Sequence, residues 1–179
     1  MITRLRHCTM SEENQISDTE DLQERLAEVQ VLLARHKLVE DLVHRQEGPR
    51  HDLVEDIVHK QHLNELQARL APMHPADIAY ILEALPLDER LIAWDLVKAE
   101  REGEILLEVS DAVRESLIAA MDSTELVAAA ETLDADQIAD LAPDLPEQVV
   151  QDVIRALPQE EREQLRAALS YKEGTVGAL

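Results

Sequence analysis

A 12-residue repeat in the C-terminal part of the chain constrains its fold more than any other feature of the sequence. Every twelfth residue from Met73 to Leu169 is apolar. The residue eight places further on is apolar in each of the first eight repeats, and these residues are Ile81, Ala93, Ile105, Leu117, Ala129, Leu141, Val153 and Leu165. Because residues four apart lie on the same side of a helix, each repeat carries one apolar face.

One continuous helix cannot bury these faces, because 12 residues turn the face by about 120° around the helix axis. The residues that open most repeats are Pro86, Ser110, Asp122, Asp134, Pro146 and Pro158. Pro is favoured at the first helical position, and Ser or Asp at the N-cap. We therefore expect stacked helices of about 8–11 residues. The regularity weakens from Lys98 to Gly103, where we expect fused repeats or a loop.

The N-terminal part follows another pattern. Residues 1–17 are polar with little periodicity, and we expect a flexible tail there. A helical pattern begins at Asp18, is interrupted at Gly48-Pro49, and resumes from about Arg50 to Leu70. Residues 37–46 and 52–61 are near-copies of each other, which favours an antiparallel helical hairpin with similar apolar faces.

We thus predict an all-α fold. Residues 18–71 form a helical hairpin, and residues 72–169 form a right-handed superhelix of short stacked helices with 12-residue repeats. Residues 170–179 are expected to be a linker. Only three residues are aromatic and none is Phe, which suits the shallow core of such a superhelix.

The charge excludes several functions. The chain has 38 Asp and Glu against 17 Lys and Arg, a net charge of −21, so nucleic acid and anionic membrane surfaces are not expected as direct partners. Cys8 is the only cysteine, which rules out an intrachain disulfide. No apolar run is long enough to span a membrane. No phosphate-binding glycine loop or G-x-S-x-G motif is present, and we predict no enzyme activity.

Two kinds of metal site are conceivable from residue spacing. Asp136 and Asp140 lie four residues apart and project from one helix face, with Asp134 and Asp144 nearby in sequence. Mg²⁺ takes one or two carboxylates and keeps several waters, so this face suits it. The alternative interpretation is that Asp134 and Asp136 only favour the start of a helix, while Asp140 faces solvent.

Histidines offer the second kind of site. His59 and His62 share a helix face, and His44 is the copy of His59 in the repeated segment. These three could bind zinc. The stronger interpretation is that they are surface or hairpin-interface histidines, because no cysteine and no H-E-x-x-H motif accompanies them.

Three segments resemble a known family. Residues 74–86 (HPADIAYILEALP), 100–110 (EREGEILLEVS) and 133–146 (LDADQIADLAPDLP) are similar, in the family's order, to the cytosolic N-terminal domain of MgtE-type magnesium transporters. Residues 169–179 resemble the segment that leads into the family's pair of CBS domains. The resemblance covers roughly residues 37–179.

This resemblance implies a superhelical domain on the cytoplasmic side of the inner membrane, followed by CBS domains and a homodimeric membrane channel. In the family, Mg²⁺ bound between the N domain and the CBS domains favours a closed arrangement. The ligand-bearing motif corresponds to Asp136 and Asp140. A further acidic position aligns near Ser116 or Glu115, and because serine cannot replace a carboxylate, Glu115 is the third candidate ligand.

The chain contains neither a CBS pair nor membrane helices, so we expect it to be part of a longer protein. The predicted function is that of a regulatory domain that senses Mg²⁺ and gates a magnesium transporter. Its expected partners are Mg²⁺ and the CBS pair and membrane domain of the same protein. The alternative is a superhelical adaptor for protein partners without metal, akin to flagellar switch proteins.

Overall fold

The computed structural model describes residues 6–43 and 51–175, and the side chains of residues 20–39 and 60–170. This described part is all-helical, which confirms the predicted all-α class. The chain divides into two compact units, Met1–Arg69 and Leu70–Leu179. The boundary falls close to residue 72, where the composition of the sequence changes.

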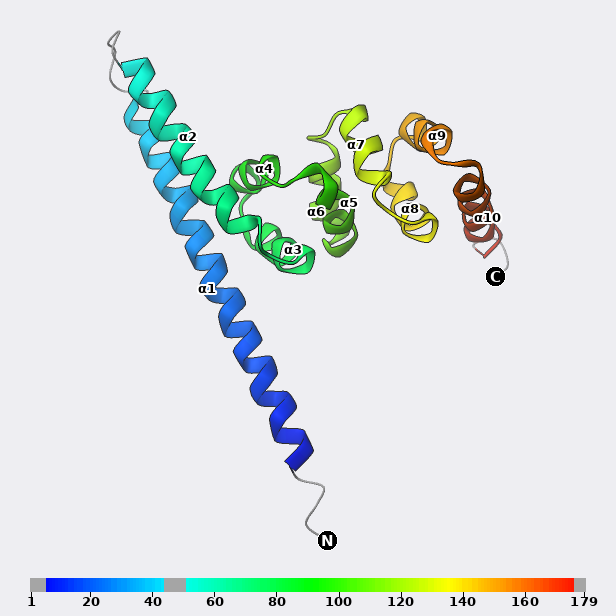
Figure 1. Cartoon of the computed structure of the whole chain (residues 1–179), viewed down its shortest axis with the longest axis horizontal. Helices are drawn as coiled ribbons and strands as arrows, with labels where there is room; N and C mark the ends of the chain where they lie inside the picture. Colours follow the sequence, from blue (N-terminus) through cyan, green and yellow to red (C-terminus); the bar gives the residue numbers. More distant parts are fainter. Residues whose placement is uncertain (1–5, 44–50, 176–179) are drawn as a thin grey trace. The chain divides into compact units, whose positions relative to one another are not determined.

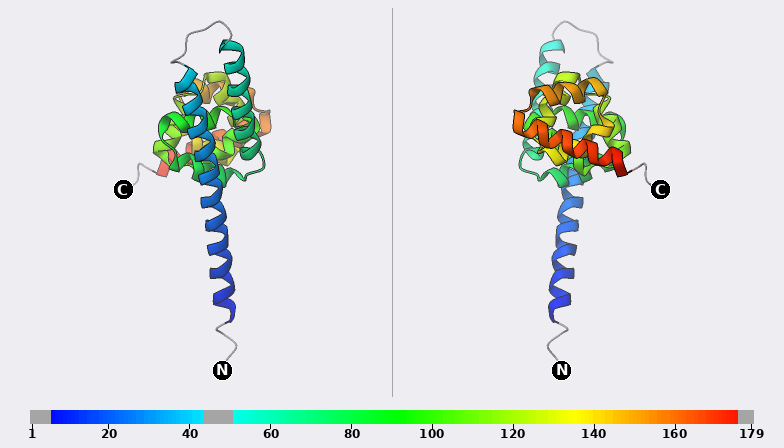
Figure 2. Two further views of the ribbon diagram at one scale, coloured as in Figure 1. Left: turned by 90° about the vertical axis from the view of Figure 1, so that its left-hand side faces the viewer. Right: turned by 90° about the vertical axis from the view of Figure 1, so that its right-hand side faces the viewer.

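The first unit consists of two long helices, α1 (Arg6–Val43) and α2 (His51–Leu70). They lie side by side and run in opposite directions (Figures 1 and 2). An ion pair of 3.5 Å joins Glu28 of α1 to Arg69 of α2. Among the side chains that the structure describes in this unit, the buried apolar ones are Val29, Leu33 and Leu66.

Helix α1 begins at Arg6, inside the segment for which the sequence predicted a flexible tail. Residues 6–17 contain neither Gly nor Pro, so no residue in this stretch breaks a helix. The absence of an apolar stripe was therefore a poor guide to backbone conformation. The interruption predicted at Gly48-Pro49 and the expected helix start near Arg50 lie outside the described residues, and the described part of α2 ends at Leu70, as we expected.

The second unit is built from short helices joined by brief connections. In chain order they are α3 (Pro75–Ala84), α4 (Leu87–Asp95), α5 (Ala99–Glu108), α6 (Asp111–Ile118), α7 (Ser123–Ala130), α8 (Ala135–Leu141), the 3₁₀ turn η1 (Ala142–Asp144), α9 (Glu147–Ala156) and α10 (Gln159–Thr175). Helix α10 has 17 residues and is longer than the repeat predicts. It includes residues 170–175, which we expected to be a linker.

The repeat positions form the core of this unit. The eight apolar residues at the eighth place of the repeats, from Ile81 to Leu165, all have 0% of their surface exposed. The residues at every twelfth position are also buried, except for Met121 and Leu169, which are half-buried. Each short helix thus turns its predicted apolar face inward.

The helices stack on their next-but-one neighbours. Helix α3 packs on α5, α5 on α7 and α7 on α9, while α4 packs on α6, α6 on η1, and α8 on α10. Figure 1 shows this succession, and the right-hand view of Figure 2 shows α9 and α10 at its C-terminal end. A helix of this length is unstable alone, so burial against these neighbours stabilises it. The right-handed sense of the superhelix stays a prediction.

The predicted helix starts are correct in kind but differ in detail. Asp122 and Asp134 form capping boxes with Glu125 and Gln137, as the sequence predicted. Pro86 stands at the N-cap of α4, one residue before the first helical position we assigned to it. Within the described residues, Pro75 of α3 is a proline that does stand at a first helical position.

No loop or fused helix occurs between residues 98 and 103, because α5 begins at Ala99 and runs through Gly103. Gly103 is buried where α5 packs on α7, and a Cβ atom built on it would lie 2.4 Å from the carbonyl oxygen of Ala129. Only glycine permits the helices to approach this closely. The irregular sequence here reflects helix contact and does not mark a break.

Gly103→Ala is expected to destabilise the second unit by about 1–3 kcal/mol, the usual cost of overpacking. The opposing gain in helix propensity is smaller, about 1 kcal/mol, and the clash involves backbone that cannot rotate away. Thermal unfolding followed by circular dichroism measures the change. Ala128→Ser, at an exposed position of α7, is the control and should change the stability by less than about 0.5 kcal/mol. Equal melting temperatures for wild type and Gly103→Ala would contradict the close approach.

Candidate metal-binding site

The candidate site is centred on α8. A capping box fixes the start of this helix, and a buried apolar face fixes its orientation. Asp134 accepts a hydrogen bond from the backbone N–H of Gln137 at 2.9 Å, and the Gln137 side chain accepts one from the N–H of Asp134 at 3.0 Å. The buried residues of α8 are Ala135, Ile138, Ala139 and Leu141. Asp136 and Asp140 stand on the exposed face, one turn apart. Packing on one face therefore presents both carboxylates to solvent on the other.

The carboxylates of Asp134, Asp136 and Asp140 differ in their contribution to the stability of α8. Asp134 is engaged in the capping box. Asp136 lies in the first turn, where the partial positive charge of the helix N-terminus favours an anion. Asp140, at the other end of the helix, lies beyond the reach of that effect. These placements agree with the sequence-based alternative, in which Asp134 and Asp136 favour the start of the helix and Asp140 is exposed.

Glu115, the third predicted ligand, belongs to another surface. It lies exposed on α6 and lines an open groove of about 690 Å³. The other residues of this groove are Asp111, Ala112, Ile118, Ala119, Asp144, Leu145 and Pro146. Neither Asp136 nor Asp140 lines it. Ser116, the alternative at this position, accepts a hydrogen bond from Arg90 Nη1 at 3.2 Å and donates one to the carbonyl oxygen of Val113 at 2.6 Å.

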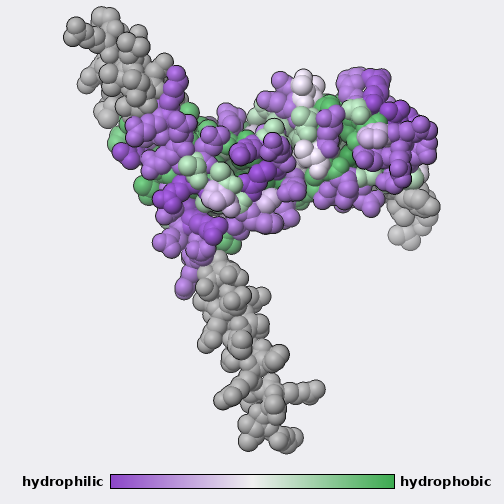
Figure 3. All heavy atoms as spheres, viewed as in Figure 1, coloured by the Kyte–Doolittle hydropathy of each residue, from purple (hydrophilic) through white to green (hydrophobic). Residues whose placement is uncertain are grey.

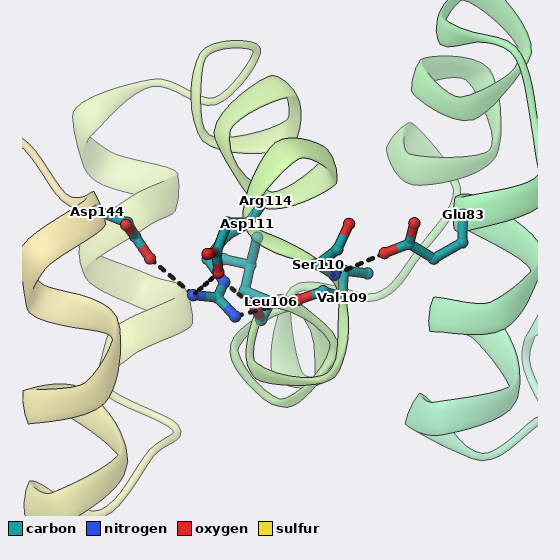
Figure 4. A network of polar contacts seen from close by, with 7 residues as sticks. All are labelled: Glu83, Leu106, Val109, Ser110, Asp111, Arg114 and Asp144. Carbon is teal, nitrogen blue, oxygen red and sulfur yellow. Dashed lines mark hydrogen bonds and ion pairs between the residues drawn. The ribbon is translucent and has the colours of Figure 1, made fainter.

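Arg114 occupies the centre of a polar network beside this groove (Figure 4). Its Nη1 lies 2.7 Å from Asp144 Oδ2 and 3.6 Å from Asp111 Oδ1. Its Nε and Nη2 donate to the carbonyl oxygens of Leu106 and Val109 at 2.6 and 3.1 Å. The side chain is only 14% exposed. Asp144, which we had placed near a magnesium site, is thereby neutralised by an arginine.

The same arrangement recurs at two other helices and was missed by the sequence analysis. Arg90 donates from Nε to the carbonyl oxygen of Leu82 and from Nη2 to that of Leu85. Arg162 donates to the carbonyl oxygens of Arg155 and Leu157. Each arginine stands five residues after the apolar residue that ends a repeat, and it satisfies carbonyls at the C-terminus of the preceding helix. The recurrence of Arg at this place was the available signal.

The described residues do not form a complete metal cage. Among the ranges 6–43 and 51–175, no group of three or more His, Cys, Asp and Glu is placed to hold an ion. The two carboxylates of α8 nevertheless fit Mg²⁺, because this ion accepts one or two carboxylates and completes its octahedron with water or with other ligands.

Hydrophilic residues cover most of the surface of the second unit that Figure 3 shows.

Another acidic group lies at α5. Burial raises the pKa of Glu102, and the charges of Glu125 and Asp95 raise it further. A carboxylate in this position is costly to ionise because it loses water and faces charges of its own sign. Glu102 therefore favours the protonated form more than an exposed glutamate does.

The histidine alternative stays a prediction. His44 and the side chain of His59 lie outside the described residues. His62 is buried in α2 with 6% of its surface exposed. A buried position on the hairpin agrees with the structural interpretation of this histidine.

The fold and the acidic helix faces define a class, namely an acidic, all-α domain of short stacked helices. The family described as MgtE intracellular N domain matches residues 73–174, which is more than half of the 179 residues. The chain belongs to this family, whose members are domains of magnesium transporters. The family is not an enzyme family. No curated protein matches the chain. None of its described helices is both apolar enough and long enough to cross a membrane.

Arg114→Ala is expected to lower the free energy of unfolding by about 2–3 kcal/mol, because it removes charge-assisted hydrogen bonds and leaves two carbonyl groups unsatisfied. Chemical denaturation measures this loss. Arg155→Ala is the matched control, because Arg155 is 70% exposed and pairs with Asp152 on its own helix. It should cost less than about 0.5 kcal/mol. Equal effects of the two substitutions would refute the structural role of Arg114.

Glu102→Gln is expected to stabilise the fold at pH 7, because it removes a charge that the folded state disfavours. Since the folded-state pKa of Glu102 is raised above 4.5, its penalty is present above that pKa and is relieved as the pH falls through it. The difference between variant and wild type should therefore shrink towards zero below pH 4.5. Glu104→Gln, at an exposed position of α5, is the control with the same change of charge. A gain that persists at low pH would contradict an electrostatic cause.

Proposed function

We propose that this domain is the Mg²⁺-sensing regulatory part of a magnesium transporter. Mg²⁺ binds at the face of α8 that carries Asp136 and Asp140, and further ligands come from another domain of the same protein. The observation that supports this proposal most is the separation of the two faces of α8. Its apolar face is committed to the core, and two exposed carboxylates one turn apart occupy the other.

The acidity of the domain makes such a sensor physically reasonable. The chain carries a net charge of −21, and its acidic surface would repel a second acidic domain. A divalent cation between the two surfaces cancels the repulsion and adds direct ligand bonds. The bound ion shifts the equilibrium towards the closed arrangement only if it binds that arrangement more tightly than the open one.

The incomplete ligand set follows from the same scheme. Two carboxylates alone hold Mg²⁺ weakly, so the isolated domain should respond only at high ion concentrations. Tight binding of Mg²⁺ then requires ligands from a second domain. Our candidate for this domain is the CBS pair of the same protein. Glu115 stands on the α6 groove and would serve a second, separate ion contact.

The wider setting belongs to the proposal as well. We place the domain on the cytoplasmic side of the inner membrane, joined through CBS domains to a homodimeric membrane channel. Loss of Mg²⁺ lets the acidic domains separate, and this movement opens the pore. The domain itself conducts no ions and acts by its position.

An adaptor function without metal is the second candidate. The observation that favours it is the α6 groove, whose lining includes Ile118, Leu145 and Pro146 beside the carboxylates. Such a mixed surface suits a peptide or helix of a protein partner. In that case Asp136 and Asp140 provide only solubility, and removing them leaves the function intact.

Mg²⁺ titration of the 179-residue chain tests the metal site directly. The amide signals of α8 in NMR spectra should shift with millimolar Mg²⁺, and the shifts should vanish in Asp136→Asn/Asp140→Asn. At ten times the dissociation constant the ion should also add about 1.4 kcal/mol to the stability. Glu160→Gln/Glu161→Gln, in the first turn of α10, is the control with the same loss of charge and should keep the shifts.

The longer protein that includes the CBS pair tests the regulation. Small-angle scattering and protease protection should show compaction with Mg²⁺ that the α8 double variant lacks. Shifts spread evenly over all acidic helices, or unchanged compaction in the variant, would sink the proposal. Unaffected transport regulation together with loss of a protein partner in variants of the α6 groove would support the adaptor instead.

A further inference from the structure

Helix α1 has a second apolar face that is exposed. Its inner face carries the buried residues Val29, Leu33 and His36. On the other side, Val31 and Leu38 are 66% and 60% exposed, although both are large hydrophobic residues. Exposure of this degree is unfavourable for apolar side chains that lie on one stripe.

The exposed face has the spacing of a helix–helix seam. Glu24, Val31 and Leu38 are seven residues apart, and Ala27 and Ala34 lie between them at the other core position of a heptad. All five are exposed. Part of the face lines an open groove of about 350 Å³, whose residues are Glu24, Ala27, Glu28, Val31, Leu32, Glu65 and Arg69.

Large and small residues alternate along this seam in a way that suits antiparallel packing. If two copies of α1 run in opposite directions, Ala27 of one faces Leu38 of the other, and Val31 faces Ala34. Each pair then combines one small and one large side chain. Because the contact has two-fold symmetry, each of the two pairs occurs twice. Two helices can approach closely where alanine meets leucine or valine, which fills the seam without overlap.

Charges beside the seam are also self-complementary. Glu28 and Arg35 occupy the same flanking heptad position, one heptad apart, and both are exposed. In the antiparallel arrangement Glu28 of each copy faces Arg35 of the other, and its carboxylate is shared with Arg69 of its own chain, whose Nη1 lies 3.5 Å away. A parallel arrangement in register would place Glu28 beside Gln23 and Arg35 beside Gln30 of the other copy, and would form no ion pair at these positions. The charge pattern therefore selects the orientation.

We infer that the exposed face of α1, from Ala27 to Leu38, binds the same face of a second copy of this chain in an antiparallel, two-fold symmetric contact. The partner is a second copy because acidic and basic residues lie in the same face at complementary places. Residues 1–72 have a net charge of −5, whereas residues 73–179 carry −16, so self-association is least opposed by charge in the first unit. This contact is independent of the proposed Mg²⁺ site.

Sedimentation equilibrium of the whole 179-residue chain tests the contact. Wild type is expected to form a dimer. Val31→Asp should raise the dissociation constant of this dimer about a hundredfold, because the buried valine is lost twice in a symmetric dimer. Leu87→Asp, at a residue of α4 that is 52% exposed, is the matched control and should leave the dimer unchanged. A wild-type chain that stays monomeric at about 1 mM, or a dimer unaffected by Val31→Asp, overturns the inference.

A charge exchange tests the pairing without introducing charge into the seam. Arg35→Glu should weaken the dimer about tenfold, because it brings like charges together at two places. Adding Glu28→Lys to the Arg35→Glu chain should restore most of the affinity. Failure of this rescue, with circular dichroism showing both variants folded, overturns the pairing.

Disulfide formation tests the orientation. With Cys8→Ser as background, chains bearing Ala27→Cys and chains bearing Leu38→Cys should cross-link when mixed under mild oxidation. Each should cross-link poorly with itself. Efficient cross-linking of Ala27→Cys with itself, and none in the mixture, would indicate parallel helices and overturn the antiparallel contact.

Discussion

The mismatch between a 12-residue repeat and the 3.6-residue turn of the α-helix is the constraint on which the rest of the second unit depends. Twelve residues carry the apolar face about 120° around the axis, so the helix has to break in each repeat before that face can be buried. Once broken, each helix is too short to be stable alone and must pack on others. The fully buried residues from Ile81 to Leu165 are the result, and the helices contact their next-but-one neighbours.

This architecture distributes the acidic residues among different tasks. Asp122 and Asp134 begin helices, and Asp144 is held by Arg114. Because the inner faces are occupied by apolar side chains, most of the other carboxylates stand outside, Glu102 being half-buried, and α8 presents two exposed ones one turn apart. The surface that we propose for Mg²⁺ is thus a consequence of how the core is built. It is incomplete as a metal site because one helix face offers too few ligands.

The first unit obeys another principle. Its helices are long, and α2, with 20 residues, pairs with part of the 38-residue α1, so a single apolar stripe on each is enough for the hairpin. Helix α1 nevertheless has apolar residues on two sides, with Val29 buried and Val31 exposed. Two helices of one chain do not account for the second stripe, whereas a second copy with complementary charges does. The two units therefore differ in both charge and mode of packing.

The sequence alone determined the all-α class, the inward face of each repeat and the capping boxes at Asp122 and Asp134, because these depend on local spacing and on residues close to each other in the chain. It also identified the family through motifs in residues 74–146. Tertiary structure decided what depends on distant neighbours. Gly103 was misread as a sign of irregularity because its role is to admit Ala129 of another helix. Likewise, Arg114 was overlooked, and only the fold reveals that it binds Asp144, which lies 30 residues away in the chain.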